Sequence, residues 1–227
     1  MSDVVIILHA PQMGENIGAA ARAILNFGFE DLRIVSPRDG WPNPKAIEMA
    51  AGAKTVIENA QVFDSLEAAI ADLQTVYATT ARMRDMDKQV ITPREIALNG
   101  KTGIIFGAER TGLENKDASL ADKIISIPVS DKYQSLNLGQ SVGIICYELF
   151  ASGKFAATQN RELASKQEFV SMVEHLEAEL DDSHFFQVPD KKPNMMNNIR
   201  NMLARAQFSA QEMRTMRGII RSLSEKK

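Results

Sequence analysis

The residues best suited to chemistry lie in three loops that each combine glycine with polar side chains. They occupy residues 11–22, 105–113 and 127–141, and each comes directly after an apolar run typical of a β-strand. Glycine lets a backbone approach a ligand closely, while polar side chains bind and orient it. In open α/β sheets, ligands bind outside the carboxyl ends of the strands. The three loops are therefore the first candidates for a binding site.

The first loop opens a helix and carries Asn16 and Arg22. A helix N-terminus with small residues can receive a phosphate. A dinucleotide fingerprint is disfavoured, because GxGxxG is not met and the next strand ends at Val35-Ser-Pro-Arg38 without a ribose-binding acid. Arg22 lies two turns into the helix. A partly buried arginine there needs an anionic partner, either a phosphate or a carboxylate.

The second loop has the glycine spacing of a nucleotide-binding P-loop, at Gly107 and Gly112. Leu-Glu follows in place of Lys-Ser/Thr, which argues against NTP hydrolysis. A glycine turn explains the two glycines but not the adjacent Glu109–Arg110 pair. In the third loop, Ser135 or Asn137 is a candidate helix N-cap. A hydrolase nucleophile is disfavoured, because the G-x-S-x-G elbow and a nearby histidine are both missing.

The elements that must position these loops alternate between strands and helices, which favours a mainly parallel sheet with helices on both faces. We expect strands at residues 4–9, 32–35, 75–79, 103–106 and 123–128, and helices at 16–27 and 137–152. The α/β domain spans 1–156 and a polar linker spans 157–166. A small all-helical module follows at 167–227, with helices at 167–180, 194–206 and 209–224 and a loop at 181–193.

Charge is distributed unevenly along the chain, although the net charge is only −3. Residues 162–182 hold seven acidic side chains against one lysine, and residues 189–227 hold nine lysines and arginines against three acids. A locally basic tail is the electrostatic footprint of an RNA-binding protein. The alternative is an ordinary solvated basic helix face.

Composition favours a soluble cytoplasmic protein of 227 residues, with 44% hydrophobic and 24% charged residues. No apolar run reaches the ~18–20 residues that span a bilayer. The N-terminus is typical of a first strand and not of an export signal. Cys146 lies in an apolar run and is expected in the core, and the three histidines have no metal-ligand spacing, so no metal site is expected.

Together, the three loops resemble the signature motifs of the SpoU branch of the SPOUT methyltransferases. The matching residues are Asn16-x-Gly18-x-x-x-Arg22, Phe106-Gly-x-Glu109-x-x-Gly112-Leu113, and Ile127-Pro128 with Ser135-Leu136-Asn137-Leu138. Thr79-Thr80-Ala81-Arg82 and the helical extension resemble the tRNA (cytidine/uridine-32-2′-O)-methyltransferase subgroup. The resemblance implies methyl transfer from S-adenosylmethionine to a ribose 2′-OH of tRNA, at nucleotide 32 of the anticodon loop. It also implies a deep trefoil knot and a homodimer with the active site at the interface.

The resemblance also implies roles for individual residues. It places cofactor-binding residues at Thr79, Thr80, Ala81, Gly107, Ile127, Gln134, Ser135 and Leu136. It makes Arg22, Asn16, Glu109, Ser135 and Asn137 catalytic, with Arg22 as proton acceptor. A guanidinium is always protonated, so a cation that holds a phosphate and stabilises the developing alkoxide is the better chemistry for Arg22. The candidate RNA-binding residues are Arg22, Arg82, Arg84, Lys191, Lys192, Arg200, Arg205, Arg214, Arg217 and Arg221.

Three other functions stay open at this point. One is rRNA 2′-O-methylation by a member of the same family. Another is a non-catalytic RNA-binding protein with this fold, which is disfavoured because every polar motif residue is present. The last is a nucleotide-binding oxidoreductase, which is disfavoured by the missing fingerprint.

Overall fold

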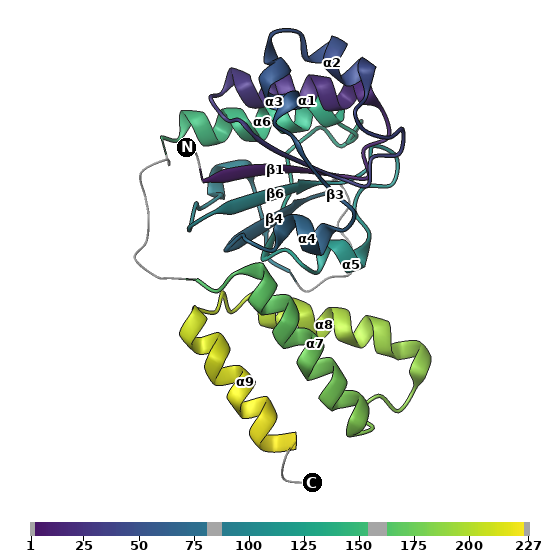
Figure 1. The fold of residues 1–227 in the computed structure, drawn as a ribbon, viewed down its shortest axis with the longest axis vertical. Coiled ribbons are helices and arrows are strands. Elements are labelled where there is room, and N and C mark those ends of the chain that lie inside the picture. Colours follow the sequence, from purple (N-terminus) through teal and green to yellow (C-terminus); the bar gives the residue numbers. More distant parts are fainter. Residues whose placement is uncertain (1–2, 81–87, 154–162, 225–227) are drawn as a thin grey trace.

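The structure is a computed structural model that describes residues 3–80, 88–153 and 163–224. An α/β domain is followed by three helices that extend from one side of it (Figure 1). This is the predicted class of fold, a mainly parallel sheet covered by helices, with a C-terminal helical module.

The sheet has seven strands in the order β3-β2-β1-β6-β4-β7-β5, and all neighbouring strands are parallel. The strands are β1 (Val4–His9), β2 (Asp31–Val35), β3 (Gln61–Phe63), β4 (Thr75–Thr79), β5 (Val90–Ile91), β6 (Thr102–Phe106) and β7 (Lys123–Ile125). The central strands β1, β4 and β6 are nearly continuous apolar runs, as expected of strands buried on both faces. Leu8 pairs with Phe106 and Thr79 with Ile125, so the carboxyl ends of four strands meet at one edge.

Helices cover both faces of the sheet. One face carries α1 (Gly14–Asn26), α2 (Pro44–Ala50), α3 (Lys54–Glu58) and α6 (Leu138–Ala151), and the other carries α4 (Leu66–Ile70) and α5 (Asn115–Ala118) (Figure 1). Short 3₁₀ turns lie at η1 (Ala51–Ala53) and η2 (Pro93–Glu95). Two glycines permit close helix packing on the first face. A Cβ on Gly18 would lie 2.5 Å from the Ala46 carbonyl oxygen, and one on Gly139 would lie 2.8 Å from the Ala19 Cβ.

Several bounds differ from the prediction. The strand expected at 123–128 ends at Ile125, and the chain then turns away from the sheet toward α6. The helix expected from residue 16 begins at Gly14. The elements β3, β5 and α2 to α5 have only two to seven residues each, too few for a hydrophobic period to be visible in the sequence.

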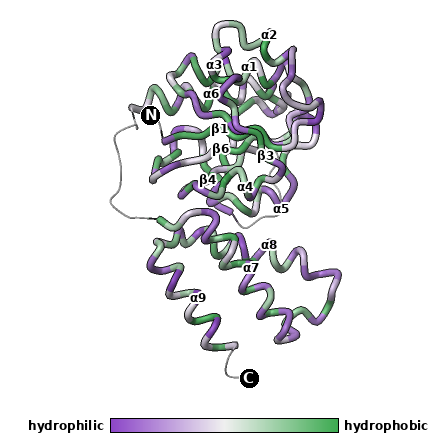
Figure 2. Tube along the Cα trace, in the orientation of Figure 1, coloured by the Kyte–Doolittle hydropathy of each residue, from purple (hydrophilic) through white to green (hydrophobic). Residues whose placement is uncertain are grey.

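The C-terminal module consists of α7 (Lys166–Asp182), α8 (Lys192–Ala204) and α9 (Ala210–Ser224), with a 3₁₀ turn η4 (Pro189–Lys191). Phe169, Met172 and Val173 of α7 form a small core with side chains of α8 and α9. Along the three helices, hydrophilic residues alternate with hydrophobic ones (Figure 2). The loop expected at 181–193 is shorter at both ends, because α7 continues to Asp182 and α8 begins at Lys192.

The module joins the α/β domain through a buried ion pair. Lys166, expected in the linker, is the first residue of α7, and its Nζ lies 2.5 Å from Asp122 Oδ1. Their side chains are 5% and 3% exposed. Asp122 Oδ2 also accepts a hydrogen bond from the backbone N–H of Val76 at 2.7 Å. The backbone N–H of Lys166 donates to the Leu73 carbonyl at 2.7 Å, so the start of α7 is fixed against the sheet domain.

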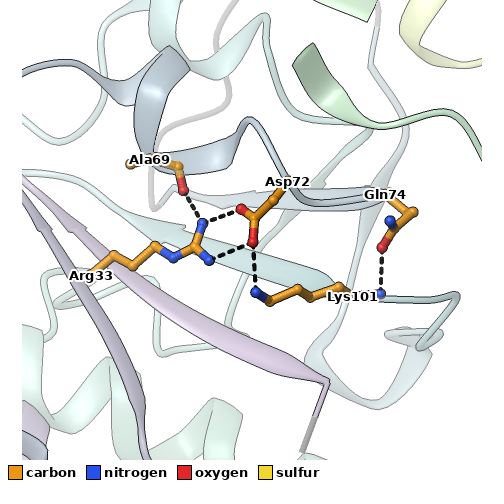
Figure 3. A network of polar contacts seen from close by, with 5 residues as sticks. All are labelled: Arg33, Ala69, Asp72, Gln74 and Lys101. Carbon is orange, nitrogen blue, oxygen red and sulfur yellow. Dashed lines mark hydrogen bonds and ion pairs between the residues drawn. The ribbon is translucent and has the colours of Figure 1, made fainter. Parts of the chain in front are cut away.

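A second buried cation connects the sheet to α4 (Figure 3). Both terminal nitrogens of Arg33 on β2 donate to the carboxylate of Asp72, at 2.5 and 2.9 Å, and one also donates to the Ala69 carbonyl at 2.5 Å. Lys101 Nζ lies 2.6 Å from the same carboxylate. These two cations hold the pKa of Asp72 far below its ordinary value, Arg33 having the larger effect. The network is structural, because it ties β2, the end of α4 and the start of β6 together.

Candidate active site

A cavity of about 330 Å³ opens at the carboxyl ends of β4, β6 and β7, where the sheet topology predicts a ligand site. Its volume is within the range of small-molecule sites. The residues that line it are Thr79, Thr80, Phe106, Gly107, Ala108, Glu109, Arg110, Thr111, Gly112, Ile125, Ile127, Gln134, Ser135, Leu136, Leu138 and Ser141. The second and third glycine-containing loops therefore meet in one place.

The two glycines of the second loop let it fold back on itself. The Gly112 N–H donates to the Ala108 carbonyl at 2.8 Å, and Gly112 has a φ of 67°, in the left-handed region. A Cβ on Gly107 would lie 2.4 Å from the Gly112 carbonyl carbon. The glycines thus serve a tight turn, which agrees with the sequence evidence against a P-loop.

A chain of hydrogen bonds connects all three loops. Glu109 accepts from Asn16 Nδ2 at 2.8 Å and from the backbone N–H of Gln12 at 2.9 Å, one bond at each carboxylate oxygen. Asn16 Oδ1 in turn accepts from Asn137 Nδ2 at 2.9 Å. Asn137 Oδ1 accepts from the N–H of Gly139 at 2.8 Å. The side chains of Asn16, Glu109 and Asn137 therefore fix the start of α1, the loop after β6 and the start of α6 relative to one another.

This network answers two questions that the sequence left open. The carboxylate of Glu109 is an anion next to the start of α1, where the sequence suggested that a phosphate could bind. Asn137 is the N-cap of α6 and forms a capping box with Gln140. Within the described residues, Glu109 pairs with no arginine, because both of its oxygens face Gln12 and Asn16.

The structure brings the candidate cofactor residues together. Seven of the eight line the cavity, namely Thr79, Thr80, Gly107, Ile127, Gln134, Ser135 and Leu136. The eighth, Ala81, lies outside the described residues, as do Arg82 and Arg84. Phe106, Ile125 and Leu138 add apolar wall to the cavity, which has the mixed lining expected of a small-molecule site.

Arg22 lies elsewhere. It is exposed on α1, does not line the cavity, and makes no hydrogen bond or ion pair with another described residue. At the C-terminal end of α1, Phe27 packs edge-on against Tyr147 of α6, with ring centroids 5.9 Å apart, and its ring centroid lies 6.1 Å from that of Phe150. Tyr147 and Phe150 are 53% and 56% exposed. We call the surface that carries exposed Arg22, Tyr147 and Phe150 and half-buried Phe27 the α1–α6 face.

The candidate RNA-binding residues of the module do not form one continuous stripe. Lys192 lies 2.6 Å from Asp181 and 3.2 Å from Glu177, and Arg200 lies 3.5 Å from Glu177. These two cations are thus partly neutralised by the acidic segment of α7. Half-buried Arg217 donates to Ser171 at 2.5 Å. The exposed cations of this set are Lys191, Arg205, Arg214 and Arg221.

Two residues near the site were missed by the sequence analysis. Arg38, in the loop after β2, donates from Nη2 to the Gln12 carbonyl at 2.6 Å and from Nε to Asp39 at 2.9 Å. Glu109 therefore holds the N–H of Gln12 while Arg38 holds its carbonyl. The sequence could have indicated Arg38, because its loop directly follows a strand. Nothing in the sequence indicates Gln12, because its contacts are made by the backbone.

The described parts of the chain contain no group of three or more histidine, cysteine or acidic side chains placed to hold a metal ion. They also contain no helix long and apolar enough to cross a membrane.

Comparisons with known proteins identify the family of the chain. Residues 3–147 match the SpoU rRNA methylase family, and residues 167–227 match the C-terminal domain of tRNA methyltransferase TrmJ. The chain is 33% identical to tRNA (cytidine-2′-O-)-methyltransferase TrmJ of Methanocaldococcus jannaschii, over 93% of this chain and 95% of the relative. It is also 33% identical to tRNA (cytidine/uridine/adenosine-2′-O-)-methyltransferase TrmJ of Pseudomonas aeruginosa, over 95% and 91%.

A solved structure is similar along nearly the whole chain. The crystal structure of TrmJ from Zymomonas mobilis has 43% sequence identity and a TM-score of 0.89, and the match covers 96% of this chain and 98% of that one. The chain therefore belongs to the SpoU methylase family, and within that family to the group of the TrmJ tRNA methyltransferases.

Proposed function

We propose that this protein transfers a methyl group from S-adenosylmethionine to a ribose 2′-OH of tRNA, at nucleotide 32 of the anticodon loop. The observation that carries the proposal is the hydrogen-bonded chain Glu109–Asn16–Asn137 beside the cavity. It connects the three loops whose motifs led to this activity. The names of the relatives support tRNA as the substrate and the ribose 2′-oxygen as the site of methylation.

The cavity suits S-adenosylmethionine. Its walls include the apolar side chains of Phe106, Ile125 and Leu138, which suit an adenine ring. Gly107 and the Gln134–Leu136 segment offer backbone and hydroxyl groups for the ribose and the amino-acid part. When bound, the cofactor supplies a methyl group already activated by the sulfonium.

The residues of the hydrogen-bonded chain act by positioning. A ribose 2′-OH is a weak nucleophile, so its alignment with the methyl carbon contributes a large part of the rate acceleration. Glu109, Asn16 and Asn137 hold the loops that line the cavity, and a shift of one loop would misalign the reacting atoms. Ser135, exposed at the cavity, is placed to orient the ribose or the cofactor.

We propose that the protein is a homodimer formed through the α1–α6 face. Exposed aromatic side chains such as Tyr147 and Phe150 are enriched in protein interfaces, and a twofold dimer would bury both copies of the patch. Arg22 lies on this face and outside the cavity of its own chain, so in the dimer it acts at the second subunit's cavity. There its guanidinium stabilises the developing alkoxide and holds the target phosphate. It remains protonated throughout, so the 2′-OH proton passes to solvent water as the methyl group moves from sulfur to oxygen.

Mixing two inactive variants tests this arrangement. Arg22→Ala and Glu109→Ala homodimers are each inactive under the proposal. If Arg22 acts across the interface, a heterodimer of the two variants has one intact site. An equimolar mixture after subunit exchange then regains about a quarter of wild-type activity. No recovery, with heterodimers demonstrated by mass, would place Arg22 at the cavity of its own chain.

We also propose that residues 126–137 form the crossing of a trefoil knot. β7 lies beyond β4 in the sheet, yet α6 packs on α1, on the other side of β6. The segment between them must therefore pass the loop at 107–112, and both line the same cavity. Knots are rare, so the family resemblance is needed to expect one.

The helical module is proposed to contact the tRNA backbone. Lys191, Arg214 and Arg221 are exposed and free of acidic partners among the described residues. Contacts of this kind position the RNA without specifying its sequence. Deletion of residues 157–227 is expected to weaken tRNA binding and flatten its salt dependence. We also propose that the protein acts in the cytoplasm, on the same tRNA substrate.

Incubation with methyl-labelled S-adenosylmethionine and separate tRNA and rRNA pools tests the function, with nuclease mapping of the labelled nucleotide. Label on the ribose of nucleotide 32 of tRNA is the expected result. Label in rRNA would favour the second candidate, rRNA methylation, which the description of the matching SpoU family supports. Label on the ribose of another tRNA nucleotide would support 2′-O-methylation of tRNA and contradict nucleotide 32 as the target.

A further inference from the structure

Arg110 lies in the tight 107–112 loop, and the proposed function gives it no role. Its side chain is exposed and lines the cavity. Among the described residues that line this cavity, Arg110 is the one cation and Glu109 the one acid. Arg110 makes no hydrogen bond or ion pair with another described residue.

The neighbouring acid does not neutralise Arg110. Both carboxylate oxygens of Glu109 are engaged on the α1 side, by Asn16 and by the N–H of Gln12. The loop backbone is held by the bond from the Gly112 N–H to the Ala108 carbonyl. The loop therefore presents a guanidinium whose donors bind no other described residue, at a fixed place beside the cavity.

A guanidinium with free donors suits an anion that binds two of them at once, such as a phosphate or a carboxylate. The exposure of Arg110 favours a polyanion that stays outside the cavity over a small molecule inside it. In RNA, the 3′-phosphate is attached to the carbon next to the one that carries the 2′-OH. A cation that holds this phosphate at the cavity would therefore also fix the distance of the 2′-oxygen from the methyl donor.

We propose that Arg110 is a substrate-binding residue that holds the 3′-phosphate of the target nucleotide, and thereby selects which ribose is presented to the cavity. This inference rests on the proposed function. It concerns a residue separate from Arg22, which lies on the α1–α6 face.

The test compares Arg110→Ala, Arg110→Lys and a control, Lys54→Ala, which removes an exposed cation of α3 that does not line the cavity. Arg110→Ala is expected to raise KM for tRNA by about 10- to 100-fold, the range for a lost hydrogen bond to a charged group. The equilibrium Kd for S-adenosylmethionine is expected to stay unchanged. Arg110→Lys keeps the charge but loses the paired donors, so its KM should lie between those of Ala and wild type. Lys54→Ala should match wild type.

Filter binding of tRNA at several salt concentrations provides a readout without turnover. Loss of one phosphate contact should reduce the slope of log K against log[salt] by about 0.7 to 0.9. An unchanged KM and slope, or a weakened cofactor Kd with unchanged tRNA binding, would overturn the proposal for Arg110. A wild-type protein that methylates no RNA would instead refute the proposed function, and the binding slopes would still decide the role of Arg110.

Discussion

The buried ion pair between Lys166 and Asp122 gives the sharpest prediction about how the helical module is held on the α/β domain. Lys166→Met leaves the Asp122 carboxylate with one hydrogen bond, from Val76, in a site where the pair is 5% and 3% exposed. Breaking a buried pair by removing one partner costs about 3–5 kcal/mol, because it leaves an uncompensated buried charge. Asp122→Asn leaves the ammonium of Lys166 in the same position and should cost a similar amount.

The effects of the two changes on the free energy of unfolding should not add. In the double variant Lys166→Met/Asp122→Asn neither charge of the pair remains, and the amide oxygen can still accept from the Val76 N–H. Replacing a buried pair by neutral groups is often close to neutral, so the double variant should return to within about 2 kcal/mol of wild type. The coupling energy, which is the difference between the loss in the double variant and the summed losses of the single variants, measures the interaction between Lys166 and Asp122.

Equilibrium urea unfolding, followed by circular dichroism and by the fluorescence of Trp41, measures these values. With a urea m-value of about 2–3 kcal/mol/M, each single variant should lower the midpoint by about 1–2.5 M. Lys116→Met is the matched control, because it breaks an exposed pair with Glu114 whose side chains are 68% and 71% exposed; its midpoint should not move. A loss below about 1 kcal/mol in Lys166→Met, the value of a surface pair, would refute the reasoning.

Three further predictions concern single side chains. Glu109→Gln turns an acceptor of the Gln12 N–H into a donor and should lower kcat by about 10- to 100-fold, with cofactor Kd little changed; an unchanged kcat in initial-rate assays would contradict this. Burial lowers the pKa of Lys88 from 10.5 to about 7, so between these pH values the folded protein has lost a proton that the unfolded chain keeps. The free energy of unfolding of the wild type should therefore rise with pH across this window, relative to that of Lys88→Met. Urea midpoints of the two proteins that differ by the same amount at pH 6.5, 8 and 9.5 would contradict this prediction. Glu177→Gln removes a carboxylate 3.2 Å from Lys192 and should tighten tRNA binding up to about 5-fold in filter binding; weaker binding would argue that Lys192 does not face RNA.

The sequence predicted the parts of the fold that follow from burial. Val4–His9 and Thr75–Thr79 are strands with the predicted bounds, because a strand buried on both faces is a short apolar run between polar segments. The helices of the module were also predicted, since one face of each is apolar at helical spacing. Short elements such as α3 (Lys54–Glu58) are held by neighbours distant in sequence, so no local pattern marked them.

The site was predictable as a set of loops but not as a set of contacts. The motifs assigned Asn16, Glu109 and Asn137 to one set of catalytic residues, and in the structure the three side chains are joined by hydrogen bonds. Which polar atom pairs with which depends on side-chain geometry that a linear sequence does not contain. The same holds for Lys192, whose sequence neighbourhood is basic while its spatial neighbours, Glu177 and Asp181, are acidic.

The placement of the two arginines argues that binding and turnover have separate requirements. The cavity and Arg110 are complete within one chain, so a single subunit has what it needs to hold a small cofactor and one phosphate. Arg22 is exposed on α1 and does not line that cavity, so in the proposed homodimer its charge stabilisation becomes available only when a second subunit covers the α1–α6 face. A variant that weakens the α1–α6 face should therefore keep cofactor binding and lose turnover. In the proposed homodimer, formation of the interface is a condition for chemistry, because the guanidinium that stabilises the alkoxide comes from the other subunit.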